Sequence, residues 1–225
     1  MPVTELTARA LLFDMDGTLV NSDAAVERCW RRWADEVGLD PDEVLRVAHG
    51  RQGRATMAEL LPDRPEELNL ADNRRILDRE TADTEGVVPV AGAPALMAAV
   101  SALPHALVTS ADSGLTRARM GAAGLTVPQV AVTAECVGAS KPDPEGFLKG
   151  AAELGFAPRD CVAFEDSAAG IAAGLAAGMR VIGVGPRAGA GPQAPTVAVA
   201  TLEQVRVEPV GDDTGLLRVV VESPH

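Results

Sequence analysis

Tyrosine is absent from this chain of 225 residues, and its other aromatic residues are four phenylalanines and two tryptophans. Aliphatic side chains must therefore fill the core, and a hydrophobic fraction of 47% is ordinary for a globular protein. A chain of this length can bury a sizeable core, either as one large domain or as a core that carries a smaller inserted domain.

Basic residues are also scarce. Twenty lysines and arginines stand against 32 acidic residues, which gives a formal net charge of −12 at pH 7. This charge argues against binding to nucleic acid or to an anionic membrane surface, because both are bound through basic patches. A small anionic substrate stays compatible with it, because one lysine, backbone N–H groups and a metal ion can reverse the local field.

Cysteine is rare as well, and Cys29, Cys136 and Cys161 show no C-x-x-C spacing. They predict neither a disulfide framework nor a zinc site and are typical of reduced cysteines in the cytoplasm. No apolar run is long enough to cross a membrane, and the first residues lack the pattern of a signal peptide. We expect a soluble cytoplasmic protein, monomeric or homodimeric, with neither a membrane nor a nucleic-acid partner.

Most of the chain alternates between short apolar runs and helical patterns. Runs typical of buried strands cover 10–13, 105–110, 131–133, 161–164 and 180–184, and helical patterns cover 94–103, 113–123, 144–154 and 167–177. This alternation predicts a parallel sheet with helices on both faces, an α/β fold of the Rossmann-like, doubly wound type.

Two regions depart from this alternation. Helical patterns alone occupy the stretch from 22 to 81, where Trp30 and Trp33 fall at helical spacing among charged residues. We expect an all-helical insert at 21–86 within a core made of 1–20 and 87–225. The C-terminal runs 205–210 and 216–221 predict a hairpin with an exposed valine-rich strand. A simple edge hairpin is favoured there over a sheet extension or an edge that pairs with a partner.

The segment FDMDGTLV, at 13–20, places Asp14 and Asp16 where the first apolar run ends and a turn begins. The carboxyl ends of strands in open α/β sheets are where such folds bind ligands. Because Gly17 can adopt unusual dihedrals, the turn can swing the second carboxylate toward the first. Converging carboxylates repel each other unless a cation lies between them, and oxygen ligands suit Mg²⁺. The motif indicates a nucleophile, an acid/base group and a hard metal ion, with Asp16 as a helix N-cap as the alternative.

Two further strand ends carry groups suited to phosphate. Thr109, Ser110 and Ala111 combine hydroxyls with backbone N–H groups that open a helix. Lys141 precedes a proline-rich turn that can aim its side chain into a cleft. Taken alone, each has an alternative: a hydroxyl of Thr109 or Ser110 can cap the following helix, and a lone lysine is usually solvated.

A last strand end carries Glu165 and Asp166, which can complete a Mg²⁺ site. The alternative is that Asp166 caps the Ala-rich helix that follows. Together, the four segments supply a nucleophile, an acid/base group, a hydroxyl donor, a cation and metal ligands, which is what phosphoryl transfer needs.

In this order, the four segments resemble the motif set of the haloacid-dehalogenase-like phosphatases over nearly the whole chain. The resemblance implies attack on phosphate through an aspartyl-phosphate. It implies these roles: Asp14 as nucleophile and metal ligand, Asp16 as acid/base group and metal ligand through its carbonyl, Ser110 or Thr109 as the second-motif hydroxyl, Lys141 as the third-motif cation, Asp166 as a metal ligand, and Glu165 acting through a bound water.

The helical insert resembles the small cap of the group that contains β-phosphoglucomutase, phosphoglycolate phosphatase and sugar phosphatases. Such a cap closes over the site, excludes water and recognises the leaving group. The segment with His49, Gly50, Arg51 and Arg54 falls where that group carries its specificity loop. These side chains are expected to bond sugar hydroxyls or phosphate, and a solvated polar loop is the alternative.

The likeness is greatest to bacterial sugar phosphatases. The sequence thus predicts a Mg²⁺-dependent phosphatase that hydrolyses sugar phosphates or related small phosphomonoesters. Val26 stands where β-phosphoglucomutases typically carry a histidine, which disfavours mutase chemistry. The alternatives are a phosphoglycolate-type organic-acid phosphatase, a phosphosugar mutase, and a module that binds a phosphometabolite without turnover.

Overall fold

A computed structural model describes residues 3–48, 52–211 and 214–222 of the protein. The described residues contain a six-stranded parallel sheet in the order β6-β5-β2-β7-β8-β9. Its strands are β2 (Ala10–Phe13), β5 (His105–Val108), β6 (Val130–Val132), β7 (Cys161–Glu165), β8 (Arg180–Val184) and β9 (Val197–Val199). The chain runs outward from β2 first in one direction and then in the other, so the predicted doubly wound α/β fold is confirmed. The edge strand β9 was not predicted.

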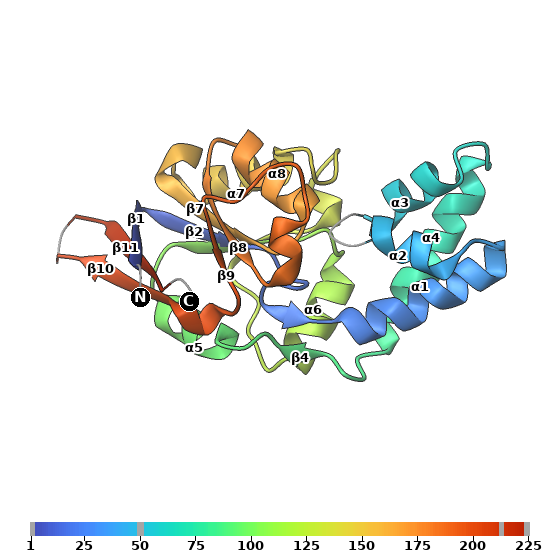
Figure 1. The fold of residues 1–225 in the computed structure, drawn as a ribbon, viewed down its shortest axis with the longest axis horizontal. Coiled ribbons are helices and arrows are strands. Elements are labelled where there is room, and N and C mark those ends of the chain that lie inside the picture. The colour runs from blue at the N-terminus through green and yellow to red at the C-terminus, as the bar shows by residue number, and fades with distance from the viewer. Residues whose placement is uncertain (1–2, 49–51, 212–213, 223–225) are drawn as a thin grey trace.

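The side chains of β2 supply both faces of the sheet. Leu11 and Phe13 belong to the hydrophobic cluster that includes α5 (Ala93–Val100) and α6 (Ser113–Ala122). Leu12 belongs to the cluster on the opposite face, beneath α7 (Glu145–Leu154) and α8 (Ala168–Ala176). Successive side chains on a strand point to opposite faces, so a continuous apolar run suits a strand buried on both sides. Figure 1 shows the sheet between the two pairs of helices.

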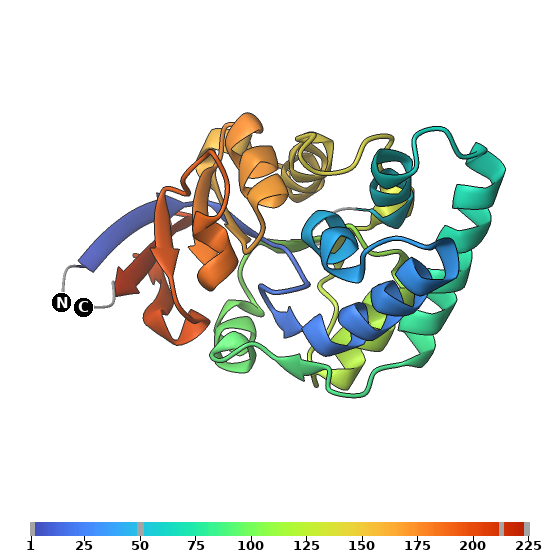
Figure 2. The ribbon, with the colours of Figure 1, turned by 45° about the vertical axis from the view of Figure 1, so that its right-hand side comes forward.

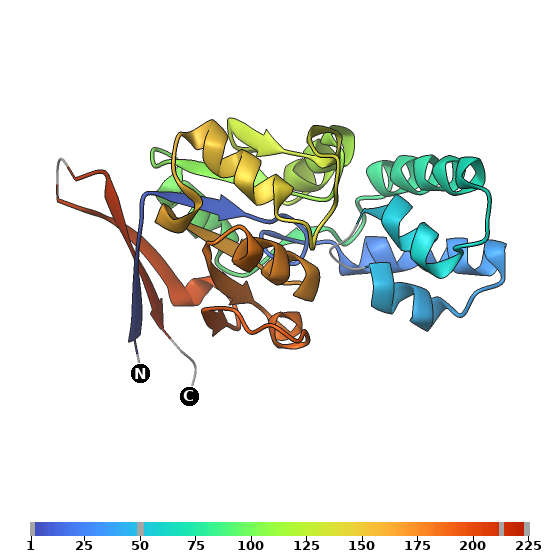
Figure 3. The same cartoon turned by 90° about the horizontal axis from the view of Figure 1, so that it is seen from above.

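Between β2 and α5 the chain leaves the sheet and forms four helices, which we call the four-helix segment. They are α1 (Asp23–Val37), α2 (Pro41–Ala48), α3 (Gly53–Leu60) and α4 (Glu66–Ala82), and they lie close to where the sequence predicts helices. The strands β3 (Val20–Asn21) and β4 (Val88–Pro89) pair where the chain leaves and returns. Trp33, Met57 and Ile76 are among the buried side chains of a separate hydrophobic cluster here. Figure 3 shows the segment at the opposite end of the molecule from both termini.

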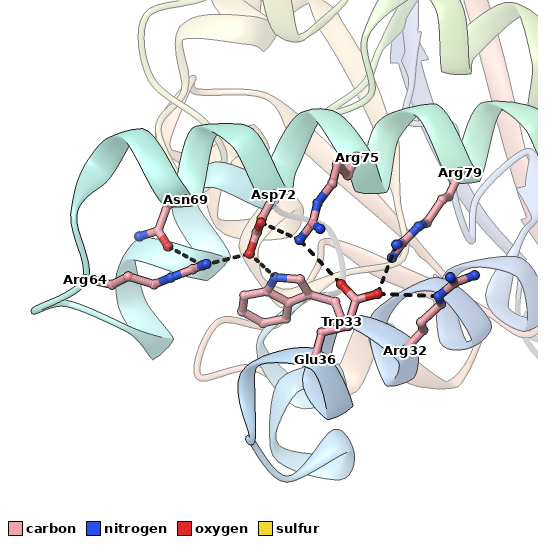
Figure 4. A network of polar contacts seen from close by, with 8 residues as sticks. All are labelled: Arg32, Trp33, Glu36, Arg64, Asn69, Asp72, Arg75 and Arg79. Atoms are coloured by element: carbon pink, nitrogen blue, oxygen red, sulfur yellow. Dashed lines mark hydrogen bonds and ion pairs between the residues drawn. The ribbon is translucent and has the colours of Figure 1, made fainter.

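A polar network joins α1 to α4 inside the four-helix segment (Figure 4). The buried carboxylate of Asp72 accepts hydrogen bonds from Trp33 Nε1 at 2.9 Å and from Arg64 Nη1 at 2.8 Å. Burial raises the pKa of Asp72, but these hydrogen bonds outweigh burial and the net pKa is lowered. Glu36 of α1 pairs with Arg79 of α4 at 2.9 Å. The network therefore fixes α1 against α4.

The C-terminal hairpin is present, as β10 (Val205–Val210) and β11 (Leu216–Glu222), but its valine-rich strand is not exposed as expected. An unpredicted strand, β1 (Val3–Ala8), pairs antiparallel with β11, which makes β11 the central strand of a three-stranded sheet (Figure 2). Val219 and Val221 are fully buried in the cluster with α5. The expectation of an edge hairpin was wrong because the partner strand lies two hundred residues away and has a weak apolar pattern of its own.

Candidate active site

Asp14 lies directly beyond β2, and its backbone N–H continues the sheet by donating to Phe164 O at 3.0 Å. The chain then turns through Gly17, whose φ of 85° belongs to the left-handed region that favours glycine. A Cβ at this position would lie only 2.1 Å from Asp166 Oδ2. The turn therefore needs glycine at this position for two reasons: its backbone conformation and the close approach of Asp166.

Asp16 follows this turn in the same loop and is not a helix cap. Its Oδ1 accepts a hydrogen bond from Ser22 Oγ at 2.6 Å, and its Oδ2 accepts one from Arg119 Nη1 at 2.8 Å. Helix α1 begins after Ser22, six residues further along the chain. Both carboxylate oxygens of Asp16 are thus oriented by side chains from separate elements.

Lys141 reaches Asp14 across 127 residues of chain. Its Nζ donates to Asp14 Oδ1 at 2.6 Å, to Glu165 Oε1 at 2.6 Å and to Val108 O at 3.0 Å. Burial lowers the pKa of Lys141, but Asp14 and Glu165 outweigh burial and hold the pKa above its usual value. The ammonium group is therefore charged and buried, and the alternative of a solvated lysine is wrong.

Glu165 and Asp166 lie at the end of β7 and face in toward Asp14. Glu165 Oε2 accepts from the backbone N–H and the hydroxyl of Ser167, both at 3.1 Å. A Cβ on Gly170 would lie 1.8 Å from Glu165 Oε1, so the first turn of α8 needs glycine to pass this carboxylate. Ser167 caps α8 through its hydroxyl, which accepts from Gly170 N, so Asp166 is not the cap.

Asp14, Glu165 and Asp166, which we call the carboxylate trio, are buried and each offers an oxygen within 4.8 Å of the others. Burial and then the charge of Glu165 raise the pKa of Asp14 well above its usual range, although Lys141 opposes the shift. Burial and Glu165 likewise raise the pKa of Asp166 to about 7. Crowded carboxylate oxygens suit a hard divalent cation, which would favour their ionised forms.

The hydroxyls expected to contact phosphate lie beyond β5. Thr109 is buried, and its Oγ1 accepts from the backbone N–H of Ala111 at 3.1 Å. Asp112 caps α6 by accepting from Leu115 N at 2.8 Å, so the cap is neither Thr109 nor Ser110. One cavity is lined by residues of three strand ends and of the four-helix segment: Asp14, Asp16, Thr109, Ser110, Ala111 and Asp166 below, and Val26, Trp30, Asn73, Ile76, Leu77 and Glu80 above.

The expected specificity loop is described only in part. His49, Gly50 and Arg51 lie outside the described residues. The guanidinium of Arg54 donates to Gln52 Oε1 at 3.0 Å and to Gly138 O at 3.2 Å. The contact with Gly138 joins α3 to the loop before Lys141, and Arg54 is not among the residues that line the cavity just described.

Sequence reasoning missed several charged residues of the site. Arg119 is 4% exposed and pairs with Asp16 and, at 3.3 Å, with Glu80. Arg187, from the loop after β8, pairs with Asp166 at 2.8 Å and with Asp23 of α1 at 2.9 Å. No local pattern marks these arginines, because charged residues on a helix or in a Gly/Pro-rich loop are ordinarily solvated.

The chain matches the family of haloacid dehalogenase-like hydrolases over residues 8–178, a range that includes Asp14, Ser110, Lys141 and Asp166. The chain belongs to this hydrolase family. Hydrolases of the family use a divalent metal ion, and the carboxylate trio supplies the kind of ligands that such an ion needs.

Similar proteins with curated functions agree with this assignment. Hexitol phosphatase A of Escherichia coli K12 is 43% identical over 181 residues, which cover 80% of this chain and 84% of the relative. Glycerol-1-phosphate phosphohydrolase 1 of Saccharomyces cerevisiae is 33% identical over 203 residues, which cover 82% and 79%. The crystal structure of β-phosphoglucomutase from Clostridium difficile has a TM-score of 0.78 over 88% of this chain and 93% of that chain, and its 20% identity shows the fold alone. Within the described part of this hydrolase, no helix has the length and apolarity needed to cross a membrane.

Proposed function

We propose that this hydrolase is a Mg²⁺-dependent phosphatase, which cleaves phosphate esters of sugars and polyols through an aspartyl-phosphate on Asp14. The observation that carries the proposal is the buried contact between Asp14 and Lys141, beside a cavity that Asp14 and Asp16 both line. These residues supply a nucleophile, a cation for the phosphate and an acid/base group at one place. Family membership and the phosphatase relatives support the same class, a phosphoric monoester hydrolase.

In the proposed reaction the Asp14 carboxylate attacks phosphorus, and the bond from phosphorus to the leaving oxygen breaks. Asp16 gives its proton to that oxygen. Asp16 then takes a proton from the water that attacks the acyl phosphate, which releases inorganic phosphate and restores Asp14. Ser22 and Arg119 hold the carboxylate of Asp16 for both transfers.

Lys141 and a hydroxyl at the end of β5 bind the phosphate oxygens in this proposal. We assign the hydroxyl role to Ser110, because it is the less buried of the two candidates, Thr109 being only 6% exposed. Ser110 lines both the main cavity and the space beside Lys141. A hydroxyl and an ammonium group together suit a phosphate that carries negative charge on several oxygens.

Mg²⁺ would be held by the carboxylates of Asp14 and Asp166 and the carbonyl of Asp16, with Glu165 acting through a water. When bound, the ion neutralises charge on the phosphate and draws the acids into their ionised forms. Glu165 is fully buried and is not among the residues that line the cavity, whereas Asp14 and Asp166 both line it and are the more accessible carboxylates of the carboxylate trio.

The four-helix segment is proposed to be a cap, 21–86, on a core made of 1–20 and 87–225. The segment roofs the cavity, so its side chains are placed to read the leaving group. By their names, the two curated relatives act on phosphate esters of neutral polyols, which favours a polyhydroxylated substrate here. His49, Gly50, Arg51 and Arg54 stay predicted substrate contacts, and a cytoplasmic location and a monomeric or dimeric state stay predictions.

The test is phosphate release from hexose, pentose, polyol and glycolate phosphates, with Mg²⁺ and with EDTA, by wild type and Asp14→Asn. We expect turnover of several sugar or polyol phosphates that disappears in EDTA and falls at least about a thousandfold in the variant. Isomerisation without phosphate release would indicate a mutase. Binding of Mg²⁺ and phosphate without turnover would indicate a binding module, and either result would overturn the proposal.

A further inference from the structure

Two charged residues meet above the cavity from opposite sides. Glu80 comes from α4 of the four-helix segment, and Arg119 comes from α6 of the core. Their side chains are 7% and 4% exposed, and Arg119 Nη2 lies 3.3 Å from Glu80 Oε2. Both line the cavity that contains Asp14 and Asp16. The pair therefore spans the junction between the core and the four-helix segment, within the lining of the cavity.

Arg119 has donors that the protein does not use. Its Nη1 donates to Asp16, and its Nη2 lies within ion-pair distance of Glu80 without forming a hydrogen bond, so among the described residues neither Nε nor Nη2 makes a hydrogen bond, although both atoms are buried. Buried donors are almost always paired in native proteins, so each unpaired one calls for an explanation. A ligand oxygen in the cavity would satisfy both groups.

Glu80 offers the complementary acceptors. Burial raises the pKa of Glu80 to about 7, although the charge of Arg119 and a hydrogen bond from Trp30 oppose the shift. Carboxylate oxygens each have more than one acceptor position, so these contacts leave capacity for a further hydroxyl. Asn73, on the same helix, also lines the cavity and adds an amide that both donates and accepts.

The charges of the lining disfavour a second anionic group on the substrate. Arg119 is paired with Asp16 and Glu80, and Arg187 is paired with Asp166 and Asp23. The lining thus carries five acids against these two arginines: Asp14, Asp16, Asp23, Glu80 and Asp166. A carboxylate or a second phosphate on the leaving group would lie near buried negative charge, where repulsion is poorly screened.

We propose that Glu80 and Arg119 form a leaving-group subsite that binds the hydroxyls of an uncharged polyhydroxylated alcohol and rejects anionic leaving groups. The inference rests on the proposed phosphatase function and narrows its substrate class to monophosphates of neutral sugars and polyols. Adjacent hydroxyls fit the pair because one can donate to Glu80 while another accepts from Arg119. Glu80 is then a specificity-determining residue, since it contacts the alcohol and not the phosphate.

The test compares kcat and KM of wild type and Glu80→Gln at saturating Mg²⁺ on three substrates: glucitol 6-phosphate, phenyl phosphate and phosphoglycolate. Phenyl phosphate has no alcohol hydroxyls, and phosphoglycolate has an anionic leaving group. For the variant we expect kcat/KM on glucitol 6-phosphate to fall at least about tenfold, mainly through KM, with phenyl phosphate changed less than about twofold. Phosphoglycolate should gain at least about tenfold relative to glucitol 6-phosphate, because a buried negative charge has been removed.

Asp78→Asn is the matched control, because it removes the same charge from the same helix at an exposed position outside the cavity. It should leave all three substrates unchanged. An equal fall on all three substrates in Glu80→Gln, with native far-UV circular dichroism, would assign Glu80 a structural role and overturn the subsite. A wild-type kcat/KM on phosphoglycolate equal to that on glucitol 6-phosphate would also overturn the subsite. Wild type that releases phosphate from none of the three would instead refute the phosphatase function itself.

Discussion

Replacement of Lys141 by methionine tests the electrostatic balance of the site most directly. Its ammonium group lies 2.6 Å from both Asp14 Oδ1 and Glu165 Oε1, and all three side chains are buried. Removing one partner from a buried ion pair typically costs about 3–5 kcal/mol, because the other charge stays desolvated and unpaired. Methionine preserves most of the side-chain volume, so a cavity adds little to this cost. We expect Lys141→Met to lose about 3–5 kcal/mol of unfolding free energy at pH 8, and to lose phosphatase activity.

The loss should also depend on pH, with a sign that the structure fixes. Without the lysine, the folded-state pKa of Asp14 rises further above its unfolded value, because the ammonium group that opposed the shift has gone. An acid with a raised pKa in the folded state loses stability as pH rises through the interval between its unfolded and folded pKa values. The deficit of Lys141→Met relative to wild type should therefore be smaller at pH 5.5 than at pH 8. The double variant Asp14→Asn/Lys141→Met should recover part of the loss, because one buried charge has gone.

Urea unfolding in EDTA, followed by far-UV circular dichroism, measures these free energies. Circular dichroism is the better probe because both tryptophans lie in α1 and report on the four-helix segment alone. The only other lysine in the chain, Lys149, makes one hydrogen bond, to Cys136 O at 2.9 Å, and Lys149→Met is the control. A Lys141→Met protein within about 1 kcal/mol of the control at pH 8, or with a deficit that does not change with pH, would refute the reasoning.

Three further outcomes follow from single contacts. Gly17→Ala should abolish most activity and destabilise the fold, because the new Cβ would lie 2.1 Å from Asp166 Oδ2. Gly38→Ala is the control, because Gly38 has a similar φ of 75° but open space around it. It should cost only about 1 kcal/mol of unfolding free energy and leave kcat unchanged. Burial raises the pKa of Glu80 to about 7, so the unfolding free energy of wild type should fall by up to about 3 kcal/mol between pH 5 and pH 8. Urea titrations at both pH values should show a smaller fall for Glu80→Gln. Asp72→Ala should lower the unfolding free energy by about 2–3 kcal/mol, because the buried N–H of Trp33 loses its acceptor and Arg64 loses its carboxylate partner. The tryptophan emission should then change at a lower urea concentration than the circular dichroism does. Two transitions that coincide and do not shift from wild type would contradict this expectation.

The sequence was sufficient for the features that depend on local periodicity and on the geometry common to parallel sheets. The apolar run at 10–13 could only be a strand buried on both faces, and Asp14 follows it directly. Because parallel strands end at one edge of the sheet, Asp14 and Asp166 could be expected to converge although they are far apart in the chain. The sequence predicted that Lys141 points into a cleft, but it lies in the loop well beyond β6, and its contact with Asp14 needed the coordinates.

Choices between local alternatives needed the backbone itself. Whether Asp166 or Ser167 caps α8, and whether Ser110 or Asp112 caps α6, depends on the dihedrals of neighbouring residues in the chain. Ser167 and Asp112 make these caps, which leaves Asp166 and Ser110 facing the site. A sequence pattern cannot separate these cases, since serine and aspartate are both common caps.

Tertiary structure alone decided which distant groups meet. Arg119 reads in the sequence as a solvated helix residue, yet packing of α4 on α6 buries it between Asp16 and Glu80. Likewise, β11 becomes a central strand only because β1, from the other end of the chain, pairs with it. The nucleophile and the carboxylates follow from residue type and strand position, which are properties of short segments. The side chains placed to select a leaving group follow from how separate elements pack, a property that no short segment carries.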